Sequence, residues 1–343
     1  MKHRTITRFL ASLALGVAGA ANAATCAPGH PQLVISHAGS LTSSFTPVET
    51  LFTQRTGVCV VDLSGGSVKL ARQLLKDRGS VDIFASADVE VNDRMLKPAG
   101  LATHAIRFAE GAMVLAYTTS SKQAATIAAP AANGAVPKAA PDWSAQLVRA
   151  GVSIGGSHPF LDPGGYRADM VFQLAQLQTQ APQLYNELLS HYVIAKPGDT
   201  LGKAFDYQLT YEHSARAALA ADTTGAYRYA SLPDAVNMGA SSPRNPYAAA
   251  GVTMPGIDGP RSATVRIPAT RVTWGLSIVE GAPNRQHAEQ FLQLLFSAEG
   301  VALRAAGPTP IDPPLASRAD IAQLPPSLHK LVRAIPDNPE PIQ

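Results

Sequence analysis

Two short loops rich in glycine and serine are the first places in this sequence where residue types point to chemistry. Gly39 and Ser40 lie in one loop, and Gly66 and Ser67 lie in the other, each between a strand-like run and a helical pattern. Serine is a neutral hydrogen-bond donor, and glycine lets a ligand approach the backbone closely. The N–H groups and dipole of a helix start also favour an anion. The loops therefore predict an anion site, although each serine could instead be an ordinary helix N-cap.

Two polar residues in the second half of the chain are candidates for the same site. Asp162 precedes Pro163 and a helical pattern, which is also the position of an N-cap. Its carboxylate would repel an anion unless it coordinates the metal centre of that anion, caps its own helix or meets a protonated ligand. Tyr211 stands before another helix, where its phenol would either donate to an anion or pack half-buried.

Enzyme chemistry is not indicated. The sequence holds neither a G-x-S-x-G elbow nor an H-E-x-x-H motif, and Lys69 is wrongly spaced for a phosphate loop. His37 and His158 flank the candidate loops, but a lone histidine is more often a packing or hydrogen-bonding residue. We therefore expect no catalytic residue and no cofactor.

The elements that must position these residues alternate between strand and helix along the first half. Apolar periodicity and β-branched runs place strands near 32–36, 58–63, 81–85 and 113–117, and helices near 41–56, 68–75 and 89–96. Such alternation predicts a parallel sheet covered by helices. Ligands of open α/β sheets bind at the carboxyl edge, which is where both Gly-Ser loops fall.

The second half continues as α/β after a linker. Residues 124–140 are rich in Ala, Pro and Gly, and residues 232–262 are dense in turn formers, so both are expected to be irregular. Between them lie a strand at 152–154 and a helix at 166–177. A strand at 271–279, a helix at 286–296 and a Pro-rich end from residue 324 complete the chain. About 320 residues after an export signal are typical of two lobes.

The first 23 residues have the layout of a secretory signal. Basic residues precede a short apolar run, and small residues lead to a cleavage site after Ala23. The apolar run is too short to span a bilayer. The signal holds three of the 28 basic residues and no acidic one, so 25 basic and 25 acidic residues remain. A net charge of zero indicates neither nucleic acid nor an anionic membrane as a partner.

The two cysteines, Cys26 and Cys59, each precede a strand-like run. If those strands are parallel neighbours, the cysteines meet at one edge of the sheet. Export favours oxidation, so we predict a Cys26–Cys59 disulfide, with two buried free thiols as the alternative.

Several segments, in order and spacing, resemble the molybdate/tungstate-binding proteins of ABC importers, and most closely the tungstate-type branch. The likeness covers most of residues 33–313. The segments are His37–Leu41, Gly66–Val68, Asp82–Asp88, Leu161–Arg167, Trp274–Ile278, Ala282–Asn284 and Phe296–Gly300.

This resemblance implies the type II periplasmic binding protein fold, two α/β lobes joined by crossing hinge strands that close over a ligand. The expected division is residues 24–117 and 271–343 in lobe one, and 118–270 in lobe two. It also implies a monomer in the periplasm that hands its ligand to a permease in the inner membrane.

The resemblance further implies roles for individual residues. Ser40 and Ser67, with Gly39 and Gly66 beside them, would bind the oxyanion from lobe one. Asp162 would reach the Mo or W centre of the bound oxyanion from lobe two, and Tyr211 would donate to an oxo group. The branch also uses a glutamate as a second carboxylate. The stretch before Asp206 looks several residues short, and the nearby candidates are Asp199 and Glu212.

The expected function is therefore capture of molybdate or tungstate for an ABC importer. Alternatives are a binding protein for sulfate, phosphate or an organic acid, and a secreted hydrolase or transferase on the same scaffold.

Overall fold

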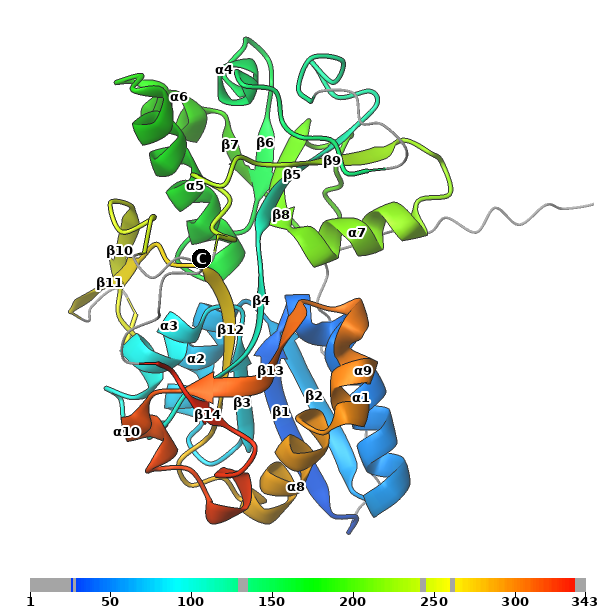
Figure 1. Ribbon diagram of the computed structural model, residues 1–343, viewed down its shortest axis with the longest axis vertical. Coiled ribbons are helices and arrows are strands. Elements are labelled where there is room, and N and C mark those ends of the chain that lie inside the picture. Colours follow the sequence, from blue (N-terminus) through cyan, green and yellow to red (C-terminus); the bar gives the residue numbers. More distant parts are fainter. Residues whose placement is uncertain (1–25, 27–28, 129–134, 241–244, 260–262, 337–343) are drawn as a thin grey trace, which may run out of the picture.

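The chain folds into two α/β lobes stacked along the long axis of the molecule (Figure 1). The structure is a computed structural model and describes residue 26 and residues 29–128, 135–240, 245–259 and 263–336. The expected signal, residues 1–23, lies outside the described residues. Within those residues, no helix combines the length and apolar character that crossing a membrane requires.

Lobe one is built on a mixed sheet whose strands, in spatial order, are β14-β13-β4-β12-β3-β1-β2. β1 pairs in parallel with β2 and β3, as expected, whereas β12 runs antiparallel to β3 and β4. The strands are β1 (Gln32–Ala38), β2 (Cys59–Gly65), β3 (Ile83–Ser86), β4 (Ile106–Gly111), β12 (Val272–Ile278), β13 (Thr309–Ala316) and β14 (Arg333–Ala334).

Helices cover this sheet by burying apolar stripes. Phe45, Val48 and Phe52 lie on the buried face of α1, and Phe52 meets Phe291 of α8 with ring centroids 5.5 Å apart. Gly57 ends α1 at a φ of 72°, a left-handed conformation that glycine adopts without strain. The helices are η1 (Gly39–Leu41), α1 (Thr42–Thr56), α2 (Ser67–Lys76), α3 (Val89–Val91), η2 (Asn92–Leu96), α8 (Arg285–Leu295), α9 (Ala298–Leu303), η3 (Arg304–Ala306), α10 (Arg318–Ile321) and η4 (Pro326–Leu328).

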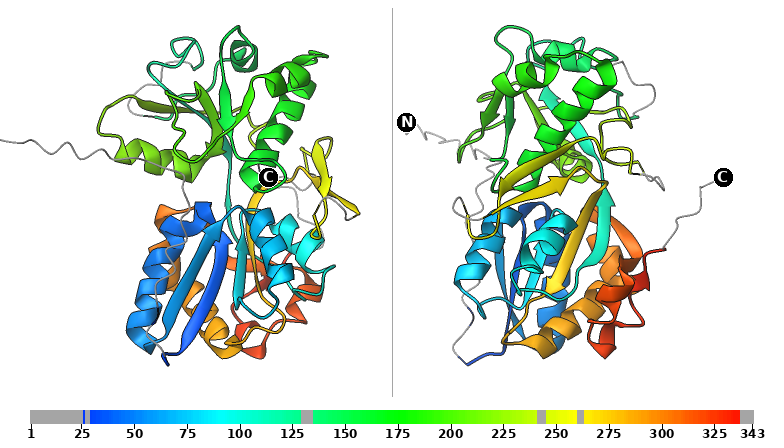
Figure 2. Two further views of the ribbon diagram at one scale, coloured as in Figure 1. Left: turned by 180° about the vertical axis from the view of Figure 1, so that it is seen from behind. Right: turned by 90° about the vertical axis from the view of Figure 1, so that its left-hand side faces the viewer.

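Lobe two has a second sheet, ordered β7-β6-β8-β5-β9, and a separate hairpin. Its longest helix, α5, packs beside the sheet and points toward lobe one (Figures 1 and 2). The elements are β5 (Met113–Thr118), α4 (Trp143–Leu147), β6 (Ile154–Gly156), α5 (Pro163–Thr179), α6 (Leu184–Ser190), β7 (Tyr192–Ile194), β8 (Tyr207–Tyr211), α7 (Glu212–Ala221), β9 (Tyr227–Ser231), β10 (Gly251–Pro255) and β11 (Thr264–Pro268).

Two passages of the chain join the lobes. The first lies at Ala112, between β4 and β5, and the second lies between β11 and β12. The first crossing therefore comes earlier than the expected boundary at residues 117 and 118, because β5 pairs with β8 and β9 of the second sheet. Apolar strands stand on both sides of Ala112, so the sequence pattern does not show that the chain changes sheets there.

The segment 232–262, expected to be irregular, contains the strand β10. Its residues pair antiparallel with β11, from Gly251 opposite Pro268 to Pro255 opposite Thr264. Because many turn-forming residues surround β10, the sequence pattern did not indicate this short strand.

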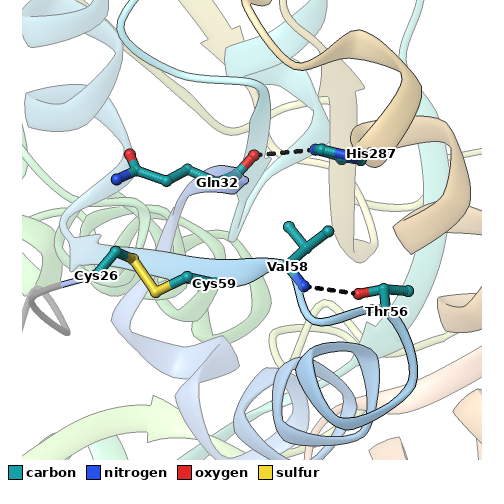
Figure 3. Close-up of a disulfide and its surroundings, with 6 residues drawn as sticks. All are labelled: Cys26, Gln32, Thr56, Val58, Cys59 and His287. Carbon is teal, nitrogen blue, oxygen red and sulfur yellow. Dashed lines mark hydrogen bonds between the residues drawn. A yellow bond between two sulfur atoms is a disulfide. The ribbon is translucent and has the colours of Figure 1, made fainter. Parts of the chain in front are cut away.

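The predicted Cys26–Cys59 disulfide is confirmed, with the two Cα atoms 5.9 Å apart (Figure 3). The parallel register places Gln32 opposite Cys59, so the bridge lies at the amino-terminal end of β1 and β2. His287 of α8 donates from Nδ1 to the carbonyl of Gln32 at 3.2 Å beside it. The bridge thus ties the start of the described chain to the edge of the lobe-one sheet.

Candidate functional site

Ser40 lies where β1 ends and faces lobe two. It is the middle residue of η1, whose N-cap is Ala38, so Ser40 does not cap a helix. Its Oγ accepts a hydrogen bond of 3.0 Å from Trp274 Nε1, and its carbonyl accepts one of 3.0 Å from His213 Nε2 of lobe two. Burial lowers the pKa of His213 to about 4, so this contact between the lobes is a neutral hydrogen bond at pH 7.

Ser67 is the first residue of α2 and is fully buried. The N-cap is Gly66, so Ser67 is not a cap either; instead its Oγ accepts a 3.0 Å hydrogen bond from the amide of Ala87. Among the hydrogen bonds of the described residues, neither Ser67 nor Ser40 donates its hydroxyl hydrogen to a protein acceptor. Both serines therefore keep a donor for a ligand, with the hydroxyl oxygen oriented by an N–H group.

Gly66 and Gly39 differ in what surrounds them. A Cβ on Gly66 would lie 2.6 Å from the carbonyl oxygen of Leu161 and 3.0 Å from Oδ2 of Asp162, whereas a Cβ on Gly39 would meet open space. Gly66 is thus the point where the backbone of lobe one touches the Asp162 loop of lobe two. Only a residue without a side chain permits that approach.

Asp162 is the N-cap of α5, with Oδ1 accepting a 2.7 Å hydrogen bond from the amide of Gly164. Burial raises the pKa of Asp162 to about 6, although the amides of Gly164 and Gly165 partly offset that effect. Since one oxygen caps the helix and the other lies toward Gly66, capping and a ligand role are compatible in one carboxyl group.

Tyr211 ends β8 and buries its hydroxyl between the lobes. Its ring packs on Trp274 at a centroid distance of 4.9 Å and is stacked with His213 at 5.9 Å. The hydroxyl is buried without a hydrogen-bond partner in the described part of the chain. Burial raises the pKa of Tyr211, Arg167 acts against this rise, and Asp162 adds to it, so these groups lie within electrostatic reach of one another.

The structure adds a buried ion pair that the sequence reasoning missed. Arg167 of α5 is 1% exposed, and its Nη2 lies 3.1 Å from Oδ2 of Asp88, which is 2% exposed and belongs to lobe one. Tyr166 donates to the same carboxylate at 2.8 Å. Burial disfavours the charge on Arg167, but Asp88 outweighs it and raises the pKa of Arg167.

Arg167 also leaves its Nε buried without a hydrogen-bond acceptor among the described residues. A signal for this role was present in the sequence, because Arg167 follows Asp162 within the first turns of the same helix. What the sequence did not show is the partner, since Asp88 comes from the other lobe.

Both candidates for a second carboxylate, Asp199 and Glu212, belong to lobe two. Asp199 accepts a hydrogen bond of 2.8 Å from the amide of Lys196 within a turn before β8. Glu212 opens α7, and its amide donates to the carbonyl of Ala112 at 3.0 Å. Of the hydrogen bonds and ion pairs in the described ranges, none joins Asp199 or Glu212 to Asp162.

Direct contacts hold the lobes together around this site. The amide of Lys69 donates to the carbonyl of Leu161 at 3.0 Å. Arg72 of α2 donates to the carbonyls of Phe160 at 2.8 Å, Pro255 at 2.8 Å and Gly256 at 3.3 Å, all in lobe two. The structure is therefore a closed form, in which α2 contacts both the Asp162 loop and the β10–β11 hairpin.

Comparison with known proteins identifies the family. A profile of the bacterial extracellular solute-binding proteins matches residues 33–307. The chain belongs to this family. Its members are solute-binding proteins.

Two curated relatives are similar to this solute-binding protein over most of their length. The molybdate/tungstate-binding protein WtpA of Thermococcus kodakarensis is 28% identical over 302 residues, covering 78% of each chain. A solute-binding protein of Petrotoga mobilis, described as uncharacterized, is 27% identical over 293 residues, covering 82% of this chain and 85% of the relative.

The fold is that of the type II periplasmic binding proteins, as the family resemblance implied. The sulfate-binding protein SubI from Mycobacterium tuberculosis superimposes with a TM-score of 0.53 at 14% identity, covering 89% of this chain and 94% of SubI. At this identity the likeness concerns the fold alone. In both the prediction and the structure, two α/β lobes are joined by crossing strands.

Proposed function

We propose that this solute-binding protein captures molybdate or tungstate between its lobes in the periplasm and delivers it to the permease of an ABC importer. The proposal is supported by the similarity to molybdate/tungstate-binding relatives over most of the chain. The disulfide suits an oxidising compartment such as the periplasm.

The observation that carries the proposal is a set of donors without acceptors at the lobe interface. Tyr211 and Arg167 each bury an O–H or N–H group that has no partner among the described residues. Ser40 and Ser67 add hydroxyl hydrogens from the opposite lobe. A buried polar group left unpaired costs roughly 1–3 kcal/mol, so converging donors of this kind call for an acceptor-rich ligand. A tetrahedral oxyanion supplies acceptors in every direction.

The site presents little net positive charge to a ligand. Asp88 neutralises Arg167, so the site offers oriented donors more than net positive charge. Asp162 has a raised pKa of about 6, so the neutral acid is accessible in mildly acidic solution and donates a hydrogen bond to an oxo group. Its ionised form would instead coordinate the Mo or W centre. Sulfate and phosphate have no metal centre, so Asp162 is the group that would separate the two ligand classes.

The donors are divided between the two lobes, so we expect the hinge to close around a bound ligand. Each lobe contributes part of the set, so one ligand contacts all of it only when the lobes meet. The contacts of Arg72 and Lys69 with lobe two then close the site.

The test is a thermal-shift series of the mature protein with molybdate, tungstate, sulfate and phosphate. A ligand that binds only the folded, closed form raises the apparent stability by RT ln(1 + [L]/Kd). We expect a large rise in Tm with molybdate and tungstate and little with sulfate or phosphate. A stronger response to sulfate or phosphate would reassign the ligand, and no response to any oxyanion would refute the proposal.

A further inference from the structure

A second cluster of ligand-type side chains lies inside lobe one, apart from the donors at the lobe interface. It consists of His37 on β1, Glu49 on α1 and Asp62 on β2. One ligand atom from each lies within 4.8 Å of the others, and the described residues hold no other such group of histidine, cysteine and acidic residues. The parallel pairing of β1 with β2 puts His37 and Asp62 on the sheet face that α1 covers.

The ring of His37 is oriented in the way that is common for metal-binding histidines. Its ring is fully buried, and Nδ1 donates a 2.7 Å hydrogen bond to the carbonyl of Ala38, which leaves Nε2 facing the cluster. A histidine that binds a metal commonly donates its other ring nitrogen to a carbonyl or a carboxylate in this way. Phe45 packs against the ring at a centroid distance of 5.2 Å and shields that side.

The cluster combines an ion pair with an unpaired carboxylate oxygen. Nε2 of His37 and Oδ1 of Asp62 are 2.8 Å apart, and although burial opposes it, Asp62 raises the pKa of His37, so a metal ion would take the place of the proton between these two atoms. Oε1 of Glu49 is buried with no partner among the described residues, and Glu49 as a whole is 8% exposed. Burial and the neighbouring carboxylate of Asp62 raise the pKa of Glu49 to about 7, whereas His37 lowers it.

We propose that His37 Nε2, Glu49 Oε1 and Asp62 Oδ1 form a binding site for a divalent transition-metal ion, with Zn²⁺ the best fit. One imidazole and two carboxylates suit Zn²⁺, which takes three protein ligands and a water in tetrahedral geometry. Tetrahedral Zn²⁺ would hold its ligand atoms roughly 3.3 Å apart, so only small side-chain shifts are needed. Ca²⁺ and Mg²⁺ prefer ligand sets made of oxygen alone.

The location of the cluster leaves the ion a route from solvent, and a bound ion there would link two elements of lobe one. Asp62 lies on β2, the edge strand of the sheet, and 26% of its side chain is exposed, so an ion can enter from the solvent. The ion would cross-link α1 to β1 just before the loop that carries Ser40. This inference does not depend on the proposed oxyanion function, because the two sites share no ligand atom.

The experiment uses the untagged mature protein, stripped with a chelator and dialysed into buffer without oxyanions. Co²⁺ is added while visible absorbance is followed, and Zn²⁺ binding is measured by calorimetry. We expect one ion per chain, displacement of Co²⁺ by Zn²⁺, and a rise in Tm with Zn²⁺. Glu49→Gln should weaken binding by more than about tenfold.

Glu299→Gln is the matched control, because Glu299 is an exposed glutamate of α9 that pairs with Arg55. It should bind Zn²⁺ as the parent does. Circular dichroism checks that each variant folds, and Asp62→Asn serves as the second test if Glu49→Gln does not fold. Absence of stoichiometric binding in the parent, or unchanged binding in a folded Glu49→Gln or Asp62→Asn variant, would overturn the proposal.

Discussion

Arg167 and Asp88 form an ion pair across the lobe interface, with Nη2 and Oδ2 3.1 Å apart and both side chains almost fully buried. The pair joins the first turns of α5 to the segment between β3 and α3. Its burial depends on the closed arrangement of the lobes, so it couples hinge closure to the charge balance of the site.

Replacing Asp88 by Asn should favour the open form. Breaking a buried pair costs about 3–5 kcal/mol, because one charge is left uncompensated. When the lobes open, the guanidinium of Arg167 regains water. The free energy lost with the ion pair should therefore shift the protein toward the open form more than it promotes unfolding. Small-angle scattering of the ligand-free protein should show a larger radius of gyration. Asp93→Asn, which removes a partly exposed partner of Lys97, should leave the radius unchanged; equal behaviour of the two variants would contradict this role.

Tyr211→Phe should leave the ligand-free protein as stable as the parent, because the lost hydroxyl has no partner in the described structure. Affinity for the bound oxyanion should fall roughly 10- to 100-fold, the loss of a hydrogen bond to a charged group of about 1.5–3 kcal/mol. Titration calorimetry measures the affinity and urea unfolding the stability. Tyr227→Phe, at the far end of β9, is the control and should change neither. Full affinity in Tyr211→Phe would remove this phenol from the site.

Gly66→Ala should obstruct closure. The added Cβ would lie 2.6 Å from the backbone oxygen of Leu161, which cannot move without displacing the loop before α5. We expect oxyanion affinity to fall at least tenfold while lobe one still folds. At Gly65 the same change places a Cβ 3.5 Å from Leu70, an ordinary contact, so Gly65→Ala is the matched control. Binding by Gly66→Ala with parental affinity would show that the lobes close differently around ligand.

Stability should fall with rising pH through the titration of Asp162. Burial raises the pKa of this carboxyl from 3.8 to about 6, so the folded state holds the proton more tightly than the unfolded state. The resulting stabilisation is complete below about pH 4 and is lost as pH rises to about 6. In Asp162→Asn this loss should vanish. Between pH 4 and pH 7 the free energy of unfolding of the variant should therefore rise relative to that of the ligand-free parent.

A carboxyl with the opposite shift provides the control for Asp162. The pKa of Asp222 is lowered to about 2, first by its hydrogen bond from the Thr224 side chain. Its contribution is therefore lost on acidification below pH 4, and Asp222→Asn should not change the slope between pH 4 and pH 7. Urea unfolding of both variants at several pH values provides the comparison, and parallel slopes in Asp162→Asn and the parent would refute the assignment.

Removing the disulfide with the pair of changes Cys26→Ser and Cys59→Ser should lower the free energy of unfolding by roughly 3–4 kcal/mol, as expected for a loop closed over a separation of 33 residues. The bridge lies at the opposite end of β1 from Ser40, so oxyanion affinity should hold. Chemical denaturation and calorimetry on the double variant measure the two effects. An unchanged unfolding free energy would show that the bridge adds nothing to stability.

Much of the fold was predictable because residues close together in the sequence determine it. Phe45, Val48 and Phe52 mark α1 at helical spacing, and Gly57 ends it. The disulfide followed from Cys26, which precedes β1, and Cys59, which begins the neighbouring strand β2. The crossing at Ala112 was predicted too late, because a strand that enters a new sheet looks like any other apolar strand.

The candidate site was predictable in part. Residue type and position in the loops pointed to Ser40, Ser67, Asp162 and Tyr211, and the structure places all of them at the lobe interface. The sequence left open whether the serines were helix caps, and the structure shows that Ala38 and Gly66 hold those positions.

By itself, the sequence determined which residues stand at the ends of strands and the starts of helices, since apolar periodicity and glycine act over a few neighbours. It also indicated neutral donors, because glycine and serine stand in the loops where Ser40 and Ser67 lie. Only the tertiary structure decided that Arg167 meets Asp88 and that the hydroxyl of Tyr211 is buried at the lobe interface beside Arg167. Those facts depend on which surfaces two separately folded lobes bring together, and no local pattern encodes the distance between them.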